Sequence, residues 1–99
     1  MWYLIIGHDR PDSLAARRAA RPAHIARLEA LRDVGRLKIA GPLPAIDAED
    51  PGPAGFVGSA LVVEFPDLEQ ARAWAEADPY REAGVYARVE VMPFRPVLP

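Results

Sequence analysis

The sequence contains no cysteine, and this absence removes several classes of site at once. Without thiols the chain forms no disulfide, offers no thiolate to a metal and has no cysteine nucleophile. It also lacks any apolar run close to the ~20 residues that cross a bilayer, and its first residues have neither the basic segment nor the apolar length of a secretion signal. We therefore expect a cytoplasmic protein with no membrane partner.

Lysine is scarce as well, and phosphate-binding motifs are absent. All but one of the 12 basic residues are arginine, so Lys38 is the only lysine available for Schiff-base chemistry. No glycine-rich dinucleotide or phosphate loop occurs, and Ser59 lacks the G-x-S-x-G context of a serine nucleophile. The net charge of −2 gives no electrostatic reason to expect nucleic acid as a partner. We therefore expect no bound cofactor and no nucleic-acid function.

The residues that are present suit one small globular domain that spans residues 1–99. The chain is 51% hydrophobic and 26% charged, as folded proteins are. A domain of this size buries only about 60–65% of its unfolded surface, and it has no room for a second core. Oligomerisation is a common way to stabilise so small a domain.

The apolar pattern predicts the element order βαββαβ. We expect strands at residues 2–7, 37–41, 56–65 and 85–94, and helices at residues 14–34 and 68–77. Ser13 is placed to begin the first helix and Gly35 to end it, whereas Pro22 predicts a kink or a restart one turn back, near Arg18. Four prolines within residues 42–55 predict a long loop there.

This order predicts an α+β fold of ferredoxin-like type, with a four-stranded antiparallel sheet and both helices on one face. Because no helix is left for the other face, we expect a second copy of the chain to cover it in a homodimer. Val62, Phe65 and Met92 are the apolar residues expected around that sheet. Alternation in the last strand predicts one face with Val85, Ala87, Val89 and Val91, and another with Tyr86, Arg88, Glu90 and Met92.

His24 is the most informative polar residue. Together with Leu28 and Leu31 it follows the i, i+4, i+7 spacing of one helical face, which should point toward the sheet. An imidazole on an inward face needs hydrogen-bond partners, so His24 is either a residue that ties the helix to the sheet or a general base in a cleft. The residues alone leave both roles open.

Asp78 is the second candidate, and it directly precedes Pro79. This dipeptide predicts a helix start at residues 79–82, with Asp78 as the N-cap and the proline at the first helical position. A carboxylate has several acceptor sites, so capping leaves room for a second partner. A histidine held by such a carboxylate has a defined tautomer and a higher basicity.

Other clusters carry weaker signals. Three arginines of the first predicted helix could form an anion-binding rim near His24 with Arg10 of the preceding loop, or simply a solvated face; they are Arg17, Arg18 and Arg21. His8 and Asp9 lie where the first strand ends, but the two histidines lack the spacing of a metal site, and we expect none. Trp2, Trp74, Tyr80 and Tyr86 are interpreted as core or interface aromatics.

Several segments, in order along nearly the whole chain, resemble the YciI (YCII-related) family. They are residues 21–28 (RPAHIARL), 35–37 with 40–42, 55–59 (GFVGS), 77–80 (ADPY), 83–86 and 91–94. The resemblance implies a ferredoxin-like domain of the dimeric α+β barrel type. It also implies a histidine and aspartate pair as the candidate active site, which by motif is His24 with Asp78.

One branch of that family resembles dehydrochlorinases of chlorinated hydroxyquinones, which implies proton abstraction or elimination on a small cyclic or anionic molecule. The resulting hypothesis is a cofactor-independent isomerase or lyase with catalytic His24 and Asp78. Arg21, Ser59 and Tyr80 are its candidate substrate-binding residues. The alternative is a non-catalytic, dimeric domain that binds a small ligand or serves as an accessory module, in which the pair is structural.

Overall fold

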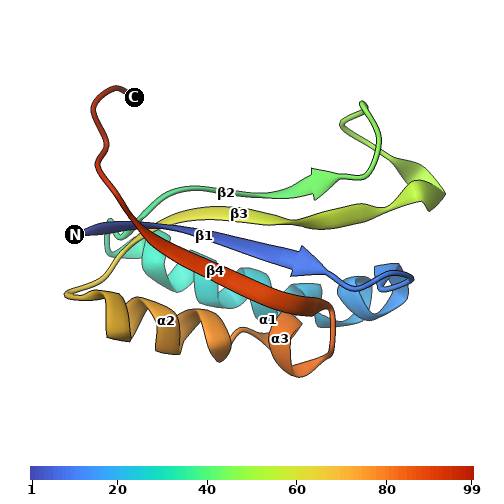
Figure 1. Ribbon diagram of the computed structural model, residues 1–99, viewed down its shortest axis with the longest axis horizontal. Helices are drawn as coiled ribbons and strands as arrows, with labels where there is room; N and C mark the ends of the chain where they lie inside the picture. The colour runs from blue at the N-terminus through green and yellow to red at the C-terminus, as the bar shows by residue number, and fades with distance from the viewer.

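The computed structural model describes residues 1–99, which form one antiparallel sheet with helices against a single face (Figure 1). The sheet order is β2-β3-β1-β4, and every neighbouring pair is antiparallel. The elements are β1 (Trp2–Asp9), α1 (Leu14–Asp33), β2 (Leu37–Pro44), β3 (Phe56–Glu64), α2 (Leu68–Glu76), α3 (Pro79–Glu82) and β4 (Tyr86–Phe94), with a 3₁₀ turn η1 (Gly52–Ala54). The predicted ferredoxin-like α+β fold is confirmed. None of the helices is long and apolar enough to cross a membrane.

Helix α1 is continuous through Pro22, so of the kink or restart predicted there the restart does not occur. Proline removes one backbone donor and leaves the carbonyl of residue 18 without its helical partner. Both Arg18 and Pro22 are exposed, so water can hydrate that carbonyl. Gly35 ends the helix as predicted: its φ is +76°, and the next N–H bonds back to the Leu31 carbonyl at 2.9 Å.

The core lies between the sheet and the helices. Alternate residues of β1 and β3 point into it and meet the inward faces of α1 and α2; the buried members are Tyr3, Ile5, Leu61, Val63, Leu28, Leu31, Ala71 and Ala75. Phe65 belongs to this core, so it does not contribute to the other sheet face. The inward face predicted for α1 is therefore correct, and it carries His24 into the same layer.

The opposite face of the sheet has no helix over it (Figure 1). Leu4 of β1 lies there, paired with Val62 of β3 and with Met92 of β4. Ile39 of β2 pairs with Val62 and is 68% exposed, and Phe94 is 38% exposed. This face thus presents an apolar surface in the single chain.

Tyr86 lies on the helix side, which corrects the face predicted for it. The register between β1 and β4 shifts after His8, so that Tyr86 pairs with Asp9. Such a bulge moves one residue to the other side of the sheet. Tyr86 is 2% exposed and packs with Tyr80, and its ring occupies the space that a side chain on Gly7 would need.

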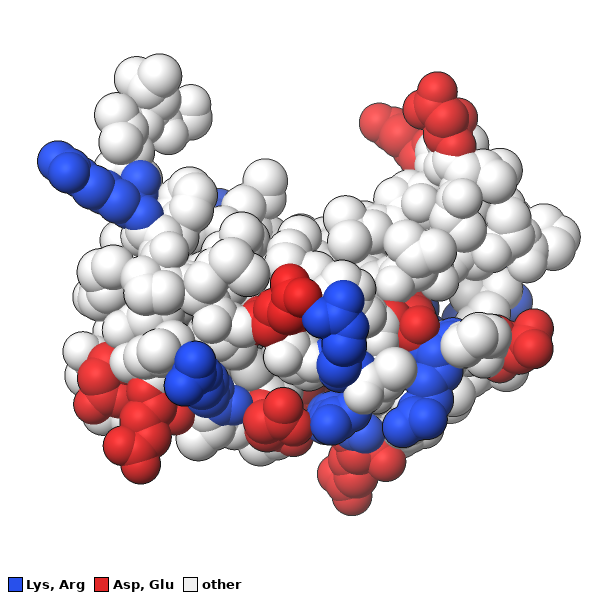
Figure 2. Space-filling view, in the orientation of Figure 1, with Lys and Arg blue, Asp and Glu red and all other residues white.

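The long loop predicted for residues 42–55 is shorter than expected. Strand β2 continues to Pro44, because edge strands tolerate proline, and η1 begins at Gly52. The remaining connection carries three exposed acidic residues at its tip, which form the red patch at the upper right of Figure 2: Asp47, Glu49 and Asp50.

Candidate functional site

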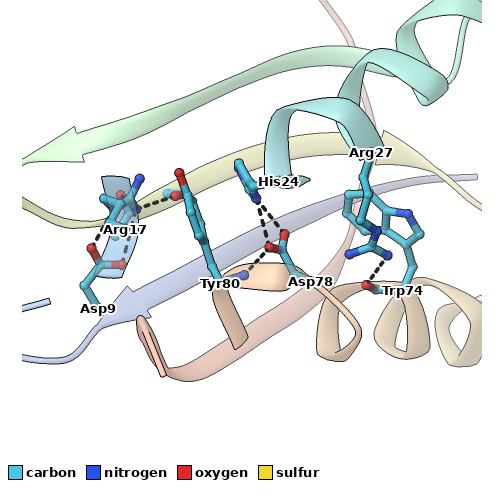
Figure 3. Close-up of polar contacts among 9 residues, drawn as sticks. Asp9, Arg17, His24, Arg27, Trp74, Asp78 and Tyr80 are labelled. Carbon is cyan, nitrogen blue, oxygen red and sulfur yellow. Dashed lines mark hydrogen bonds and ion pairs between the residues drawn. The ribbon is translucent and has the colours of Figure 1, made fainter. Parts of the chain in front are cut away.

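His24 and Asp78 meet although 54 positions separate them in the sequence. His24 comes from the inward face of α1, and Asp78 from the junction of α2 and α3 (Figure 3). Nδ1 of the imidazole lies 2.9 Å from each carboxylate oxygen. Both residues are almost completely buried, at 5% and 2% exposure. A carboxylate can only accept here, so the neutral ring carries its proton on Nδ1.

Asp78 also caps α3, as the sequence predicted. Its Oδ1 accepts a hydrogen bond from the backbone N–H of Tyr80 at 2.8 Å, and Pro79 occupies the first turn. One carboxylate therefore serves the helix and the histidine together. Because the cap restrains the side chain, Asp78 presents its oxygens to His24 in a fixed orientation.

The ring of Tyr80 lies between His24 and Arg17 (Figure 3). It stacks on the imidazole with centroids 4.0 Å apart and planes 14° apart, and the Arg17 guanidinium carbon lies 4.7 Å from its centroid. Burial raises the pKa of the Tyr80 phenol, and the charges of Arg17 and Arg21 oppose that shift only in part. The hydroxyl therefore stays protonated near neutral pH.

Arg17 organises the far end of the site. Its Nε and Nη2 bind the Asp9 carboxylate at 2.9 and 3.2 Å, and Nη2 also donates to the Gly58 carbonyl at 2.9 Å and to Ser59 Oγ at 2.7 Å. Burial lowers the pKa of Arg17, but hydrogen bonding and charge from Asp9 outweigh it, so the pKa is raised overall. Burying a cation is tolerable when a carboxylate pairs with it in this way.

In the sequence, Arg17 and Asp9 are only weak candidates for the site. A stronger signal was present, because Arg17 precedes His24 by seven residues and so shares its helical face two turns earlier. Asp9 follows the buried part of β1, but nothing in the sequence pairs it with an arginine on the next helix.

A cavity of about 110 Å³ opens beside these side chains, between α1 and strands β2 and β3. All predicted site residues except Asp78 line it; the lining is Arg17, Arg21, His24, Ile25, Leu28, Ala40, Gly41, Pro42, Ser59 and Tyr80. Arg21 is exposed at its rim, whereas Asp78 lies behind His24. This volume is below the roughly 150 Å³ of a cavity that holds benzene, so a ring bound here would enter only in part and would extend past the exposed Arg21 at the rim.

The other sequence candidates lie elsewhere. His8 is on the helix-free face, with Nε2 at 3.6 Å from Glu90, so the two histidines do not share a site. No group of three or more histidine, aspartate or glutamate side chains lies close enough together to hold a metal ion. Of the arginines proposed as a rim, Arg18 is exposed, and Arg10 lines a separate, open pocket of about 490 Å³ at the start of α1.

Arg27, three residues after His24 on α1, connects this helix to α2. Its Nη2 donates to the Trp74 carbonyl at 2.8 Å, and its guanidinium carbon lies 4.3 Å from the centre of the Trp74 ring. Burial lowers the pKa of Arg27, and the charge of Asp78 opposes that shift. Arg27 therefore ties α1 to the last turn of α2, immediately before the residue that holds His24.

Comparisons with known proteins agree with the fold. The family model of the YCII-related domain matches residues 1–95. Proteins called YciI from Escherichia coli and Shigella flexneri are 57% identical over 97 residues, which covers 98% of this chain and 99% of each relative. The structure of 5-chloro-2-hydroxyhydroquinone dehydrochlorinase from Burkholderia phenoliruptrix, complexed with 2,5-dihydroxybenzoquinone, matches with a TM-score of 0.82 and 32% identity, over 96% of this chain and 94% of that one.

Proposed function

The chain belongs to the YCII-related domain family, and from that premise we propose that it is a small enzyme in which His24 acts as a general base on a small cyclic or anionic molecule. The observation that carries the proposal is the fixed imidazole. Asp78 holds Nδ1 at 2.9 Å through both oxygens while the same ring lines a cavity. Asp78 is the residue that orients the base.

The geometry assigns separate tasks to the two ring nitrogens. Nδ1 keeps its proton against Asp78, so the lone pair lies on Nε2, which takes no part in that contact. When Nε2 accepts a proton, the carboxylate stabilises the imidazolium that forms. General base catalysis of this kind contributes about 10²–10⁴-fold to a rate.

The reaction class that we propose is isomerisation or elimination. The dehydrochlorinase acts, by its name, on a chlorinated hydroxyhydroquinone, and its fold and 32% identity make related chemistry reasonable for this chain. Arg21, Ser59 and Tyr80 line the cavity as substrate-binding residues. This chain offers His24 for proton transfer and no cysteine or G-x-S-x-G serine for a covalent intermediate.

An activity assay with matched histidine variants tests the proposal. Wild-type protein, His24→Gln and His8→Gln are incubated with 5-chloro-2-hydroxyhydroquinone, and chloride release is followed with an ion-selective electrode. We expect release by wild type and by His8→Gln, because His8 lies on the other sheet face, and a loss of at least 100-fold for His24→Gln. Equal release by the two variants would remove His24 from the mechanism.

A non-catalytic ligand-binding role is the second candidate, and the burial of the pair favours it. Breaking a purely structural contact leaves an unsatisfied buried group and costs about 1–3 kcal/mol of stability. In that case His24→Gln lowers the free energy of urea unfolding, and neither protein releases chloride. Catalytic His24 predicts the reverse pattern, with a large loss of turnover and a small loss of stability.

We also propose that the helix-free face of the sheet binds a second copy of the chain. The face is apolar at Ile39, Val62 and Met92. The acidic tip of the β2–β3 connection rises at one end of it, whereas Lys38 and Arg95 are exposed at the other. A two-fold axis that lies in the interface and runs across the strands places the acidic end of each copy near the basic end of its partner.

Light scattering coupled to gel filtration tests the dimer with two variants of equal exposure. Ile39 is 68% exposed on the helix-free face, and Val34 is 67% exposed at the end of α1. We expect Ile39→Glu to be a monomer, because it buries a charge in the interface, and Val34→Glu to remain a dimer. A wild-type monomer at micromolar concentration would exclude the proposed assembly.

A further inference from the structure

Arg17 also lines the cavity beside His24, although the proton-transfer proposal gives it no role, and that proposal does not specify which ligand group Tyr80 binds. Both residues line the cavity although they are only 6% and 1% exposed. Neither Arg17 Nη1 nor the Tyr80 hydroxyl makes a hydrogen bond within the chain, yet neither is among its fully buried polar atoms without a partner. Both atoms therefore keep some access to solvent, on side chains that line the cavity.

Arg17 has donors to spare. Its four hydrogen bonds use Nε and Nη2, and none uses Nη1, which carries two N–H groups. Asp9 and the Gly58 carbonyl hold the guanidinium in place without occupying that side of it. A rigidly held cation with unused N–H groups facing a cavity is suited to bind an oxyanion.

Tyr80 supplies a second donor beside the first. Its ring lies between Arg17 and His24, with the guanidinium carbon 4.7 Å and the imidazole centroid 4.0 Å from its own centroid (Figure 3). The phenol stays protonated near neutral pH because burial raises its pKa. Arg17, Tyr80 and His24 all line one cavity, so the two oxyanion donors and the base border the same space.

We propose that Arg17 Nη1 and the Tyr80 hydroxyl bind an ionised oxygen of the ligand, and that the ligand is a small ring bearing a hydroxyl or enol conjugated to a carbonyl. The proposal rests on the function proposed for His24 and specifies the substrate class of that site. Asp9 is a positioning residue, because it contacts Arg17 and does not line the cavity, whereas Ser59 both contacts Arg17 and lines the cavity.

The corresponding reaction step needs no reagent other than the ligand and His24. Nε2 of His24 takes a proton from a ring carbon next to the carbonyl, and the C–H bonding pair moves onto the carbonyl oxygen. The resulting enolate is held by the N–H groups of Arg17 and the O–H of Tyr80. The electron pair then returns from the oxygen to the ring. In an isomerisation, another ring carbon takes up the proton. In an elimination, the returning pair expels a leaving group such as chloride.

Binding measurements with a charged and an uncharged ring test this site apart from catalysis. The probes are 2,5-dihydroxybenzoquinone, whose acidic hydroxyls are ionised at neutral pH, and 2,5-dimethoxybenzoquinone, which has no ionisable group. Affinities are measured by calorimetry for wild type, Arg17→Gln and Tyr80→Phe. The matched controls are Arg18→Gln on the exposed side of α1 and Tyr86→Phe, whose hydroxyl is sealed in the core.

We expect the anionic ring to bind wild type at least tenfold more tightly than the dimethoxy ring. Arg17→Gln should weaken the anion at least tenfold and the dimethoxy ring less than twofold, because a hydrogen bond to a charged group is lost only with the anion. Tyr80→Phe should likewise weaken binding of the anion more than binding of the dimethoxy ring. It therefore provides a second test if Arg17→Gln fails to fold. Both control variants should bind like wild type.

Three results overturn the inference: no binding of the anion to wild type at millimolar concentration, equal binding of the two rings, or unchanged anion binding by both Arg17→Gln and Tyr80→Phe. Failure of the general-base proposal looks different. His24→Gln would then retain wild-type turnover, whatever the affinity of the anion for the Arg17 variant.

Discussion

Replacing Asp78 by asparagine tests the central feature of the site with the smallest change in shape. In the native protein Oδ1 accepts from the Tyr80 N–H at 2.8 Å, while Oδ1 and Oδ2 both face Nδ1 of His24. In Asp78→Asn the amide oxygen must keep the Tyr80 N–H, because an NH₂ group cannot accept it. The amide nitrogen therefore replaces Oδ2 beside the imidazole.

We then expect the imidazole to change its tautomer. An amide N–H facing an Nδ1–H would place two donors together. A ring protonated on Nε2 instead accepts from the amide at Nδ1, and the amide oxygen, which also lies 2.9 Å from Nδ1, then serves the Tyr80 N–H alone. The base would then lack a lone pair on Nε2, and turnover should fall by about 10²–10⁴-fold. Stability should fall by only about 1–2 kcal/mol, because one charge-assisted hydrogen bond becomes a neutral one and the cap of α3 survives.

Two measurements separate these effects. Proton–nitrogen NMR correlations of the His24 ring report which nitrogen carries the proton, and urea unfolding reports the stability. Asp67→Asn is the control, because Asp67 caps α2 through the Gln70 N–H at 2.8 Å and has no histidine partner. It should change neither property by a measurable amount. The reasoning is refuted if Nε2 of His24 stays unprotonated in Asp78→Asn.

Alkaline pH should weaken the fold, because burial raises the pKa values of Tyr80 and Tyr86 above that of a free phenol. Neutral phenols favour the folded state below pH ~10, and that contribution is lost as the pH rises through the folded-state pKa values. Urea midpoints between pH 8 and 11 should therefore decline only above pH ~10, and less steeply in Tyr86→Phe; a flat profile contradicts this. Gly7→Ala should cost at least about 1–3 kcal/mol, because its methyl group would overlap the Tyr86 ring. Gly41→Ala, with open space around it, should cost less than half as much in the same unfolding assay.

The fold was largely readable from local patterns. The order of strands and helices follows from apolar periodicity, and the inward face of α1 from the spacing of His24, Leu28 and Leu31. The Asp78–Pro79 start of α3 was also correct, because capping depends on a few adjacent residues. The contact between His24 and Asp78 was predicted in another way. The sequence pattern identified each residue as a separate candidate, and only the resemblance to the family paired them.

The errors arose where distant strands and solvent decide the outcome. Tyr86 was placed on the wrong side because the bulge after His8 is set by pairing between β1 and β4, which alternation within one strand does not report. The restart expected at Pro22 did not occur, because that side of α1 faces water.

The sequence by itself determined which elements form, which face of α1 is apolar, and that the site chemistry rests on imidazole, carboxylate and guanidinium rather than thiol or amine. The tertiary structure alone decided that Arg17 meets Asp9 and Ser59, and that Tyr80 lies between Arg17 and His24. Periodicity is a property of a few consecutive turns of chain. Contacts across eight, 42 or 54 positions depend instead on how strand register and helix packing place whole elements beside one another.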